Sequence, residues 1–186
     1  LHRLDFDKLV AESHGMRTVE TMHRVAPHLD VAAEAQRFMA GEAADTQDIY
    51  ALPGAVKLLG MIPAGDWIVV TSANRPLAKV RMQSAGLPLP EMMVTAEDVQ
   101  RGKPDPEPYL LGAEKINTSV EGGIVIEDSP AGIRAAKAAG LRVIAVVTTH
   151  KKEELTQADF IVESLAQLCV VTNQNENHRL TIQIED

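Results

Sequence analysis

A short apolar run that stops at two adjacent carboxylates constrains this chain more than any other feature. Residues 124–126 are three consecutive β-branched residues, as a buried parallel strand requires, and Glu127 and Asp128 follow directly. After a turn, residues 133–139 alternate apolar and basic side chains at helical spacing, and Gly140 stands where a glycine often ends a helix. This order predicts an α/β fold with acids at the carboxyl end of a strand.

The paired acids admit two interpretations. Ligands of open α/β sheets bind at the carboxyl ends of the strands, where two carboxylates offer hard oxygen ligands suited to Mg²⁺. Alternatively, Asp128 caps the next helix and Glu127 is a solvated loop residue. This stretch by itself does not decide between them.

The composition narrows the class of protein. A chain of 186 residues predicts one domain, or one domain with a small appendage, and we expect a monomer. The net charge of −8 and the scattered Lys and Arg give no electrostatic case for binding nucleic acid or an anionic membrane. The single cysteine, Cys169, excludes an internal disulfide framework and fits a reducing compartment. With neither a membrane-length apolar run nor a signal segment, we expect a cytoplasmic protein.

The first 50 residues read as helical. Residues 1–50 contain no strand-like run, and their apolar side chains recur at helical spacing, which predicts two or three helices. His14 and Arg17 lie on either side of a glycine turn in this region. Such cationic or potentially cationic groups suit a phosphate-ester or hydroxyl-rich substrate. Surface positions beside a helix start explain them equally well.

The pattern changes after residues 52–54, Leu-Pro-Gly, which we interpret as a hinge or linker into a second unit. Residues 67–70 form an apolar run that predicts a strand, and Ser72 lies in the small polar segment that follows it. Such a segment after a parallel strand leaves backbone N–H groups and a side-chain O–H free to hold a phosphate. Taken alone, this signal is weak.

A further strand is predicted over residues 92–95, before the proline-rich segment 101–108. The prolines restrain the backbone around Lys103 while its ammonium group stays free to reach a charged centre; a rigid solvated loop is the alternative. The pattern also predicts helices over residues 55–60, 76–85 and 109–116, strands over 143–147 and 160–162, and a possible edge strand over 179–184.

Three loops, each after a predicted strand, therefore carry a hydroxyl (Ser72), a cation (Lys103) and the paired acids. Phosphoryl transfer from an aspartyl nucleophile needs this set. A donor and a cation bind the phosphate oxygens, and carboxylates hold Mg²⁺ against the developing charge. The order and spacing of the three loops are more specific than any one of them.

The chain resembles the haloacid dehalogenase superfamily of phosphatases over nearly its whole length. Within it, the likeness is to the glycerol-phosphate and 2-deoxyglucose-6-phosphate phosphatases, through the segments SHGMRT, ALPGAVKLL, VVTSANR, TAEDVQRGKPDPEPYLLGA and VIEDSPAGIRAAKAAG. The resemblance implies a Rossmann-like parallel sheet with a small helical cap. It also implies a Mg²⁺-dependent phosphatase of sugar or polyol phosphates that works through an aspartyl-phosphate.

The resemblance assigns a role to each candidate residue and a boundary to each part. It implies a partial cap over 1–50, an α/β core over 51–175 and a tail over 176–186. By this resemblance, the phosphate-binding and catalytic residues are Ser72 and Lys103, and Ala73 and Asn74 complete the phosphate loop. His14 and Arg17 are expected to face the substrate. Glu127 and Asp128 are expected to be the acids on the metal side, with Asp128 as the direct ligand.

One departure from the family pattern concerns the nucleophile. The family's first motif is an apolar strand followed by Asp-x-Asp-Gly-Thr, and we do not find it. Asp5-Phe6-Asp7 is followed by Lys8-Leu9 instead of Gly-Thr, and it reads better as a helix start. We therefore expect the printed chain to lack its central strand and nucleophile and to be inactive by itself. Residue 1 is Leu, which favours an absent N-terminal piece.

The alternative to an enzyme is a truncated or non-catalytic relative that binds a phosphorylated metabolite or a protein partner. A nucleotide-binding dehydrogenase is disfavoured, because no Gly-x-Gly-x-x-Gly follows a predicted strand.

Overall fold

The computed structural model describes residues 13–173 and 179–185. The Asp5–Asp7 segment, expected to start a helix, lies outside the described residues.

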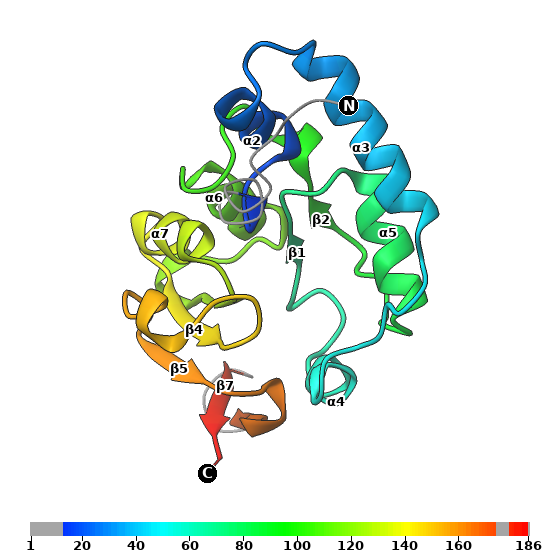
Figure 1. Ribbon diagram of the computed structural model, residues 1–186. Helices are drawn as coiled ribbons and strands as arrows, with labels where there is room; N and C mark the ends of the chain where they lie inside the picture. Colours follow the sequence, from blue (N-terminus) through cyan, green and yellow to red (C-terminus); the bar gives the residue numbers. More distant parts are fainter. Residues whose placement is uncertain (1–12, 174–178, 186) are drawn as a thin grey trace.

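Two parallel sheets form the centre of the molecule (Figure 1). β1 (Val69–Val70) pairs with β2 (Met93–Val94), while β3 (Ile124–Glu127), β4 (Arg142–Val146) and β5 (Phe160–Val162) form the second sheet in that order. The predicted parallel α/β fold is confirmed. Within the described part of the chain, β1 pairs only with β2 and β3 only with β4, so the two sheets face each other across an unpaired gap.

Helices follow the strands, as the predicted pattern requires. Short side chains cap two of them: Asn74 accepts a hydrogen bond from Leu77 N at 2.9 Å, and Ser129 accepts one from Gly132 N at 3.1 Å. The helices after the hinge are α4 (Ala55–Gly60), α5 (Arg75–Ser84), α6 (Glu107–Lys115) and α7 (Pro130–Ala138), with the 3-10 turns η1 (Ala96–Asp98), η2 (Val120–Gly122), η3 (Lys152–Glu154) and η4 (Leu165–Gln167).

The strand β4 is apolar on both sides because both faces of its sheet are covered. Val143 and Ala145 pack into a cluster with α6 and α7, whereas Ile144 and Val146 pack on the opposite face against α4 and the start of β6. This double burial fixes the position of β3, which pairs with β4 and carries the acidic pair at its end.

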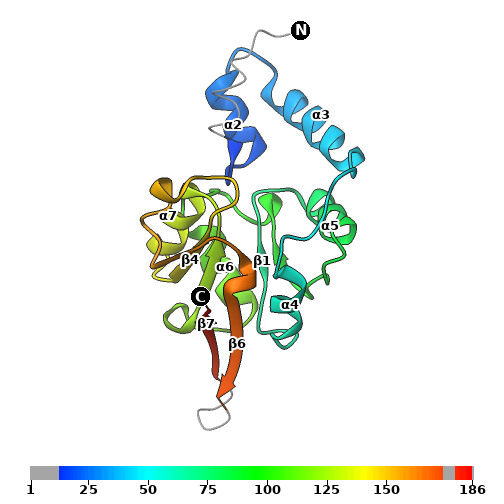
Figure 2. The ribbon, with the colours of Figure 1, turned by 60° about the horizontal axis from the view of Figure 1, so that its bottom comes forward.

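The N-terminal described residues form the helices α2 (Thr18–Val25) and α3 (Val31–Ala44), which confirms the helical prediction for this part. They pack on each other through Met22, Val31 and Ala35. Figure 2 shows these helices at one end of the molecule and the C-terminal strands at the opposite end.

The strand predicted over residues 179–184 is confirmed. β7 (Arg179–Ile184) pairs antiparallel with β6 (Leu168–Asn173), a partner that the sequence did not predict. Leu168, at the start of β6, is buried against β4, and this contact attaches the hairpin to the core. None of the helices in residues 13–173 and 179–185 is long and apolar enough to cross a membrane.

Candidate active site

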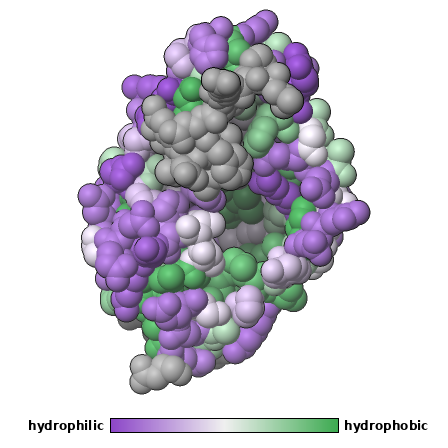
Figure 3. Space-filling model, viewed as in Figure 1, coloured by the Kyte–Doolittle hydropathy of each residue, from purple (hydrophilic) through white to green (hydrophobic). Residues whose placement is uncertain are grey.

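A cavity of about 780 Å³ opens between the two sheets. Val70 of β1 lines one side and Ile126 of β3 the other, so the cavity occupies the gap between the unpaired strands. The space-filling view shows this hollow at the centre of the molecule, with apolar residues in its depth (Figure 3). The predicted site residues on its wall are His14, Ser72, Ala73, Lys103, Glu127 and Asp128.

Lys103 is a buried cation held by a buried acid. Its side chain is about 6% exposed, and its Nζ donates to Glu127 Oε1 and, at 3.3 Å, to the carbonyl of Val70. The ammonium also lies 5.0 Å from the centre of the Tyr109 ring, a cation–π contact. These contacts fix Lys103 at the cavity wall.

Glu127 uses both of its oxygens inside the protein. Oε1 accepts from Lys103 Nζ and from Tyr109 Oη at 2.9 Å; Oε2 accepts from Asp128 N and Ser129 N, both at 2.8 Å, and from Ser129 Oγ at 3.0 Å. A Cβ at Gly132 would collide with the carboxylate, so a glycine is needed there.

Protonation follows from these contacts. Burial alone raises the pKa of Glu127, but the Lys103 ammonium and the hydrogen bonds from Ser129 and Asp128 outweigh it and lower the pKa to about 2. Burial, and then the charge of Glu127, raise the pKa of Tyr109 well above its usual value. Glu127 is therefore charged and Tyr109 neutral at ordinary pH.

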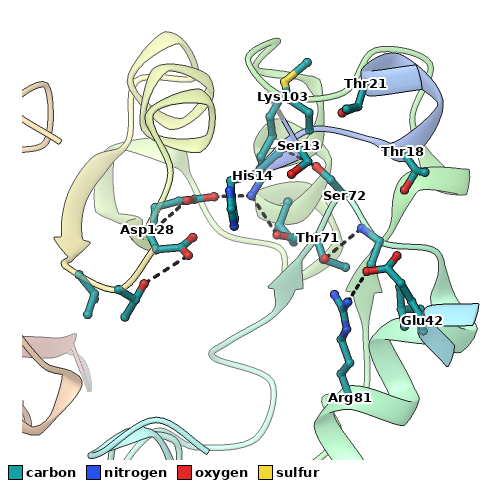
Figure 4. Close-up of a pocket in the computed structure, with 18 of the residues that line it drawn as sticks. Ser13, His14, Thr18, Thr21, Glu42, Thr71, Ser72, Arg81, Lys103 and Asp128 are labelled. Carbon is teal, nitrogen blue, oxygen red and sulfur yellow. Dashed lines mark hydrogen bonds and ion pairs between the residues drawn. The ribbon is translucent and has the colours of Figure 1, made fainter. Parts of the chain in front are cut away.

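The two acids consequently have different surroundings. Asp128 faces the cavity, and its Oδ2 accepts from Thr149 Oγ1 at 2.9 Å and from Thr148 Oγ1 at 3.3 Å (Figure 4). The alternative in which Asp128 caps the helix and Glu127 is solvated is wrong, because Ser129 is the cap of α7 and Glu127 is buried. A cation in the cavity would meet Asp128, whereas both Glu127 oxygens are already occupied.

The residues of the loop after β1 also differ in whether they line the cavity. Ser72 lines the cavity and its hydroxyl donates to the carbonyl of Gly15 at 2.7 Å; Ala73 lies beside it on the wall. Asn74 is not among the lining residues, since its side chain caps α5 and contacts Met39 Sδ at 3.4 Å. The structure therefore places the Asn74 side chain on the helix start, and its predicted role at the phosphate stays a prediction.

His14 and Arg17 are also separated. His14 lies on the wall, where its ring meets that of His150 edge to face, with centroids 5.5 Å apart. Arg17 is not among the lining residues. Its guanidinium instead contacts Glu20 and donates to the carbonyls of Val99 and Gln100. The structure therefore places Arg17 against residues 99–100, and its predicted contact with the substrate stays a prediction.

Sequence reasoning missed the outer wall of the cavity. Thr18 and Thr21 of α2 and Phe38 and Glu42 of α3 line it, and Glu42 forms an ion pair with Arg81 of α5 at 2.6 Å. The spacing of three between the threonines and of four between Phe38 and Glu42 marks one face of each helix. No local signal links Glu42 with Arg81, 39 residues away.

Comparison with known proteins identifies the family. A sequence model of the haloacid dehalogenase-like hydrolases matches residues 6–146. The chain belongs to this family. It is 41% identical over 179 residues to hexitol phosphatase A of Escherichia coli, covering 94% of this chain and 83% of that protein. It is 33% identical over 197 residues to glycerol-1-phosphate phosphohydrolase 1 of Saccharomyces cerevisiae, covering 98% and 78%.

The fold is shared with solved members. CbbY from Rhodobacter sphaeroides, in complex with xylulose-(1,5)bisphosphate, superposes with a TM-score of 0.73 at 27% identity, covering 88% of this chain and 80% of that one. The predicted family and hydrolase class are confirmed.

Proposed function

We propose that this haloacid dehalogenase-like hydrolase is a Mg²⁺-dependent phosphatase of sugar or polyol phosphates that works through an aspartyl-phosphate. The observation that carries the proposal is convergence: Ser72, Lys103 and Asp128 come from three loops that follow β1, β2 and β3, and all three line one cavity. A hydroxyl, a cation and a carboxylate around one space are suited to a phosphate group and its metal ion.

Lys103 binds the phosphate oxygens in this proposal. The Glu127 carboxylate holds its ammonium at the wall, so the positive charge is already in place when a substrate arrives. Because both groups are buried, their electrostatic effect on the phosphoryl group is screened less than it would be in water. Ser72 lies on the cavity wall just after β1 and contributes a hydroxyl.

Asp128 fits a magnesium ion. Its carboxylate is a hard oxygen donor on the cavity wall, and the Thr148 and Thr149 hydroxyls orient it. The described residues contain no cluster of three or more His, Cys, Asp or Glu able to hold a metal, so Asp128 would share the ion with substrate oxygens and water, as Mg²⁺ sites commonly do. When bound, the ion neutralises negative charge on the transferring phosphoryl group.

We assign the attacking carboxylate to a segment outside the described residues. The acids that line the cavity in the described part are Glu42, Glu127 and Asp128; Glu42 pairs with Arg81, and Glu127 is fully hydrogen-bonded. A strand between β1 and β3 would satisfy both unpaired edges and direct an aspartate into the cavity. Attack on phosphorus releases the alcohol, and water then frees inorganic phosphate and restores the carboxylate.

The substrate class rests on the outer wall and on the relatives. Thr18, Thr21, Glu42 and Arg81 offer hydrogen-bonding groups that match a chain of hydroxyls. Relatives that cover most of this chain are named for hexitol phosphate and glycerol-1-phosphate hydrolysis. We therefore place α2 and α3 as a cap that reads the leaving group; the monomeric state and the cytoplasmic location remain predictions.

Phosphate release from glycerol-1-phosphate, hexitol phosphates and 2-deoxyglucose-6-phosphate, with Mg²⁺ and with EDTA, tests the proposal. We expect phosphate to be released in the presence of Mg²⁺ and not in the presence of EDTA. A second candidate is a protein that binds a phosphorylated metabolite without cleaving it, which is favoured by the lack of an unengaged second acid among the described lining residues. Saturable binding of these esters by calorimetry without phosphate release would support that candidate instead.

A further inference from the structure

Arg17 precedes the first turn of α2 and Glu20 lies in it, and both side chains contact the backbone immediately ahead of Lys103. Arg17 Nη1 donates to the carbonyl of Val99 at 3.2 Å, and Nη2 to that of Gln100 at 2.9 Å. Glu20 Oε1 accepts from Arg17 Nε at 2.9 Å and from Gly102 N at 3.3 Å. An ion pair within one helix start is thus fastened to a loop more than 80 residues away.

This contact is closely packed. A Cβ at Gly102 would lie 2.8 Å from Arg17 Nε and 2.9 Å from Glu20 Oε2, so a side chain there would have to displace Arg17 and Glu20. Glu20 Oε2 is buried and, within the described residues, has no hydrogen-bond partner. The side chains of Arg17 and Glu20 are 20% and 26% exposed, so water screens their ion pair only in part, and the Arg17 guanidinium is the cation that balances Glu20.

The loop is held from its other side as well. Gln100 N and Arg101 N donate to the Glu107 carboxylate of α6 at 2.7 and 3.0 Å. Since α6 belongs to the core, it fixes the loop, and Arg17 and Glu20 attach α2 to a fixed support. Lys103 follows Gly102 directly, so one peptide separates this attachment from the cation of the site.

The same helix start forms part of the cavity wall. His14, Thr18 and Thr21 line the cavity, and the carbonyl of Gly15 accepts from the Ser72 hydroxyl. We propose that Arg17 and Glu20 form a latch that holds α2 closed against residues 99–102. The latch keeps the part of the outer wall formed by α2 at a fixed position relative to Lys103. The proposal rests on the proposed phosphatase function, and Arg17 acts in it as a positioning residue without touching substrate.

The latch makes a specific kinetic prediction. Esters whose leaving group contacts α2 need the closed wall, so an enzyme that is closed for only about a tenth of the time binds them about tenfold more weakly. A small acyl phosphate such as acetyl phosphate has a leaving group too small to reach α2, so its hydrolysis should depend little on the closed wall. A latch defect therefore raises KM for polyol phosphates and leaves kcat for acetyl phosphate nearly unchanged.

The experiment compares Arg17→Ala with Arg37→Ala in the active enzyme. Arg37 forms an ion pair with Glu34 at 3.3 Å, with the same spacing of three residues, but its side chain is 76% exposed on α3. It is therefore a matched control. We expect KM for glycerol-1-phosphate to rise about tenfold in Arg17→Ala and to stay within about twofold in Arg37→Ala. Arg17→Lys keeps the charge without the planar guanidinium, so its KM should lie between those of Arg17→Ala and the wild type.

Gly102→Ala tests the same contact from the loop side. Its Cβ would displace Arg17 and Glu20, so the single variant should reproduce the KM increase. Arg17→Ala removes the obstructing side chain, and the double variant should therefore be no worse than Arg17→Ala alone. Additive losses would contradict a shared contact.

Hydrogen–deuterium exchange supplies a readout that does not depend on activity. Amides of residues 18–25 should exchange faster in Arg17→Ala and Gly102→Ala than in the wild type or Arg37→Ala. Unchanged exchange, or equal losses of activity on glycerol-1-phosphate and acetyl phosphate with a lowered melting temperature, would overturn the latch. A wild type that hydrolyses no phosphate ester would overturn the proposed function, and the exchange comparison would still decide the latch.

Discussion

Two ion pairs on the wall of the cavity differ in almost every physical respect. Lys103 and Glu127 are each about 6% exposed, and both Glu127 oxygens have further hydrogen-bond donors. Arg81 and Glu42 are 48% and 28% exposed, and a single hydrogen bond of 2.6 Å joins them. The first pair lies at the end of the cavity proposed to hold the phosphate, and the second lies on the outer wall.

The difference indicates which end of the cavity can vary. Removing one partner of a buried pair leaves an uncompensated charge and costs about 3–5 kcal/mol, whereas exposed pairs contribute about 0–1 kcal/mol. The phosphate end is therefore fixed by folding. The outer wall can change its side chains with little loss of stability, which suits a surface that reads different leaving groups.

The largest effect is expected for Lys103→Ala. The variant removes the fixed cation from the proposed phosphate site, so kcat should fall by about 10² or more. Turnover measured at saturating substrate checks this, with a thermal melt to confirm that the variant is folded. A folded variant with ordinary turnover would remove Lys103 from the site.

Asp128→Asn should weaken the response to Mg²⁺. The change keeps the size of the side chain but removes the charge that faces the cavity, so half-maximal activity should need at least about tenfold more Mg²⁺. Titration of activity with MgCl₂ is the measurement. Asp159→Asn is the control, since Asp159 pairs with Lys137 away from the cavity; an equal response in both variants would contradict the assignment.

The buried pair of Lys103 and Glu127 should also give stability a pH dependence. The pKa of Glu127 falls from 4.5 to about 2 in the folded state, so its contribution is fully present above pH 4.5 and is lost as the pH falls through about 2. Urea unfolding between these pH values should show a smaller loss of stability in Glu127→Gln than in the wild type. A Glu127→Gln variant whose stability falls as steeply with pH as that of the wild type would contradict the role of the buried pair.

The smallest effect is expected for Glu42→Ala. Because the pair with Arg81 is exposed, unfolding free energy should change by no more than about 1 kcal/mol. KM should shift a few-fold for polyol phosphates and remain unchanged for acetyl phosphate. Kinetics on a polyol phosphate and on acetyl phosphate test this, and a large loss of stability would mean that the outer wall is part of the folding core.

The sequence by itself determined the α/β class and, through its resemblance to known members, the family; it also placed Ser72, Lys103 and Asp128 after strands whose ends meet at one cavity, where their roles stay predictions. The class and the placement could be predicted because strand, turn and helix patterns are local, and parallel strands end at a common edge. A residue directly after a strand is therefore placed by its position alone.

Only the tertiary structure decided where side chains point once the elements pack. Arg17 and Asn74 belong to the predicted segments, yet Arg17 contacts the loop before Lys103 and Asn74 caps a helix. Glu127 and Asp128 are adjacent, but Lys103 and Tyr109 donate to Glu127, whereas Asp128 faces the cavity. Such outcomes depend on partners that are distant in sequence, and local spacing does not determine which donor pairs with which oxygen.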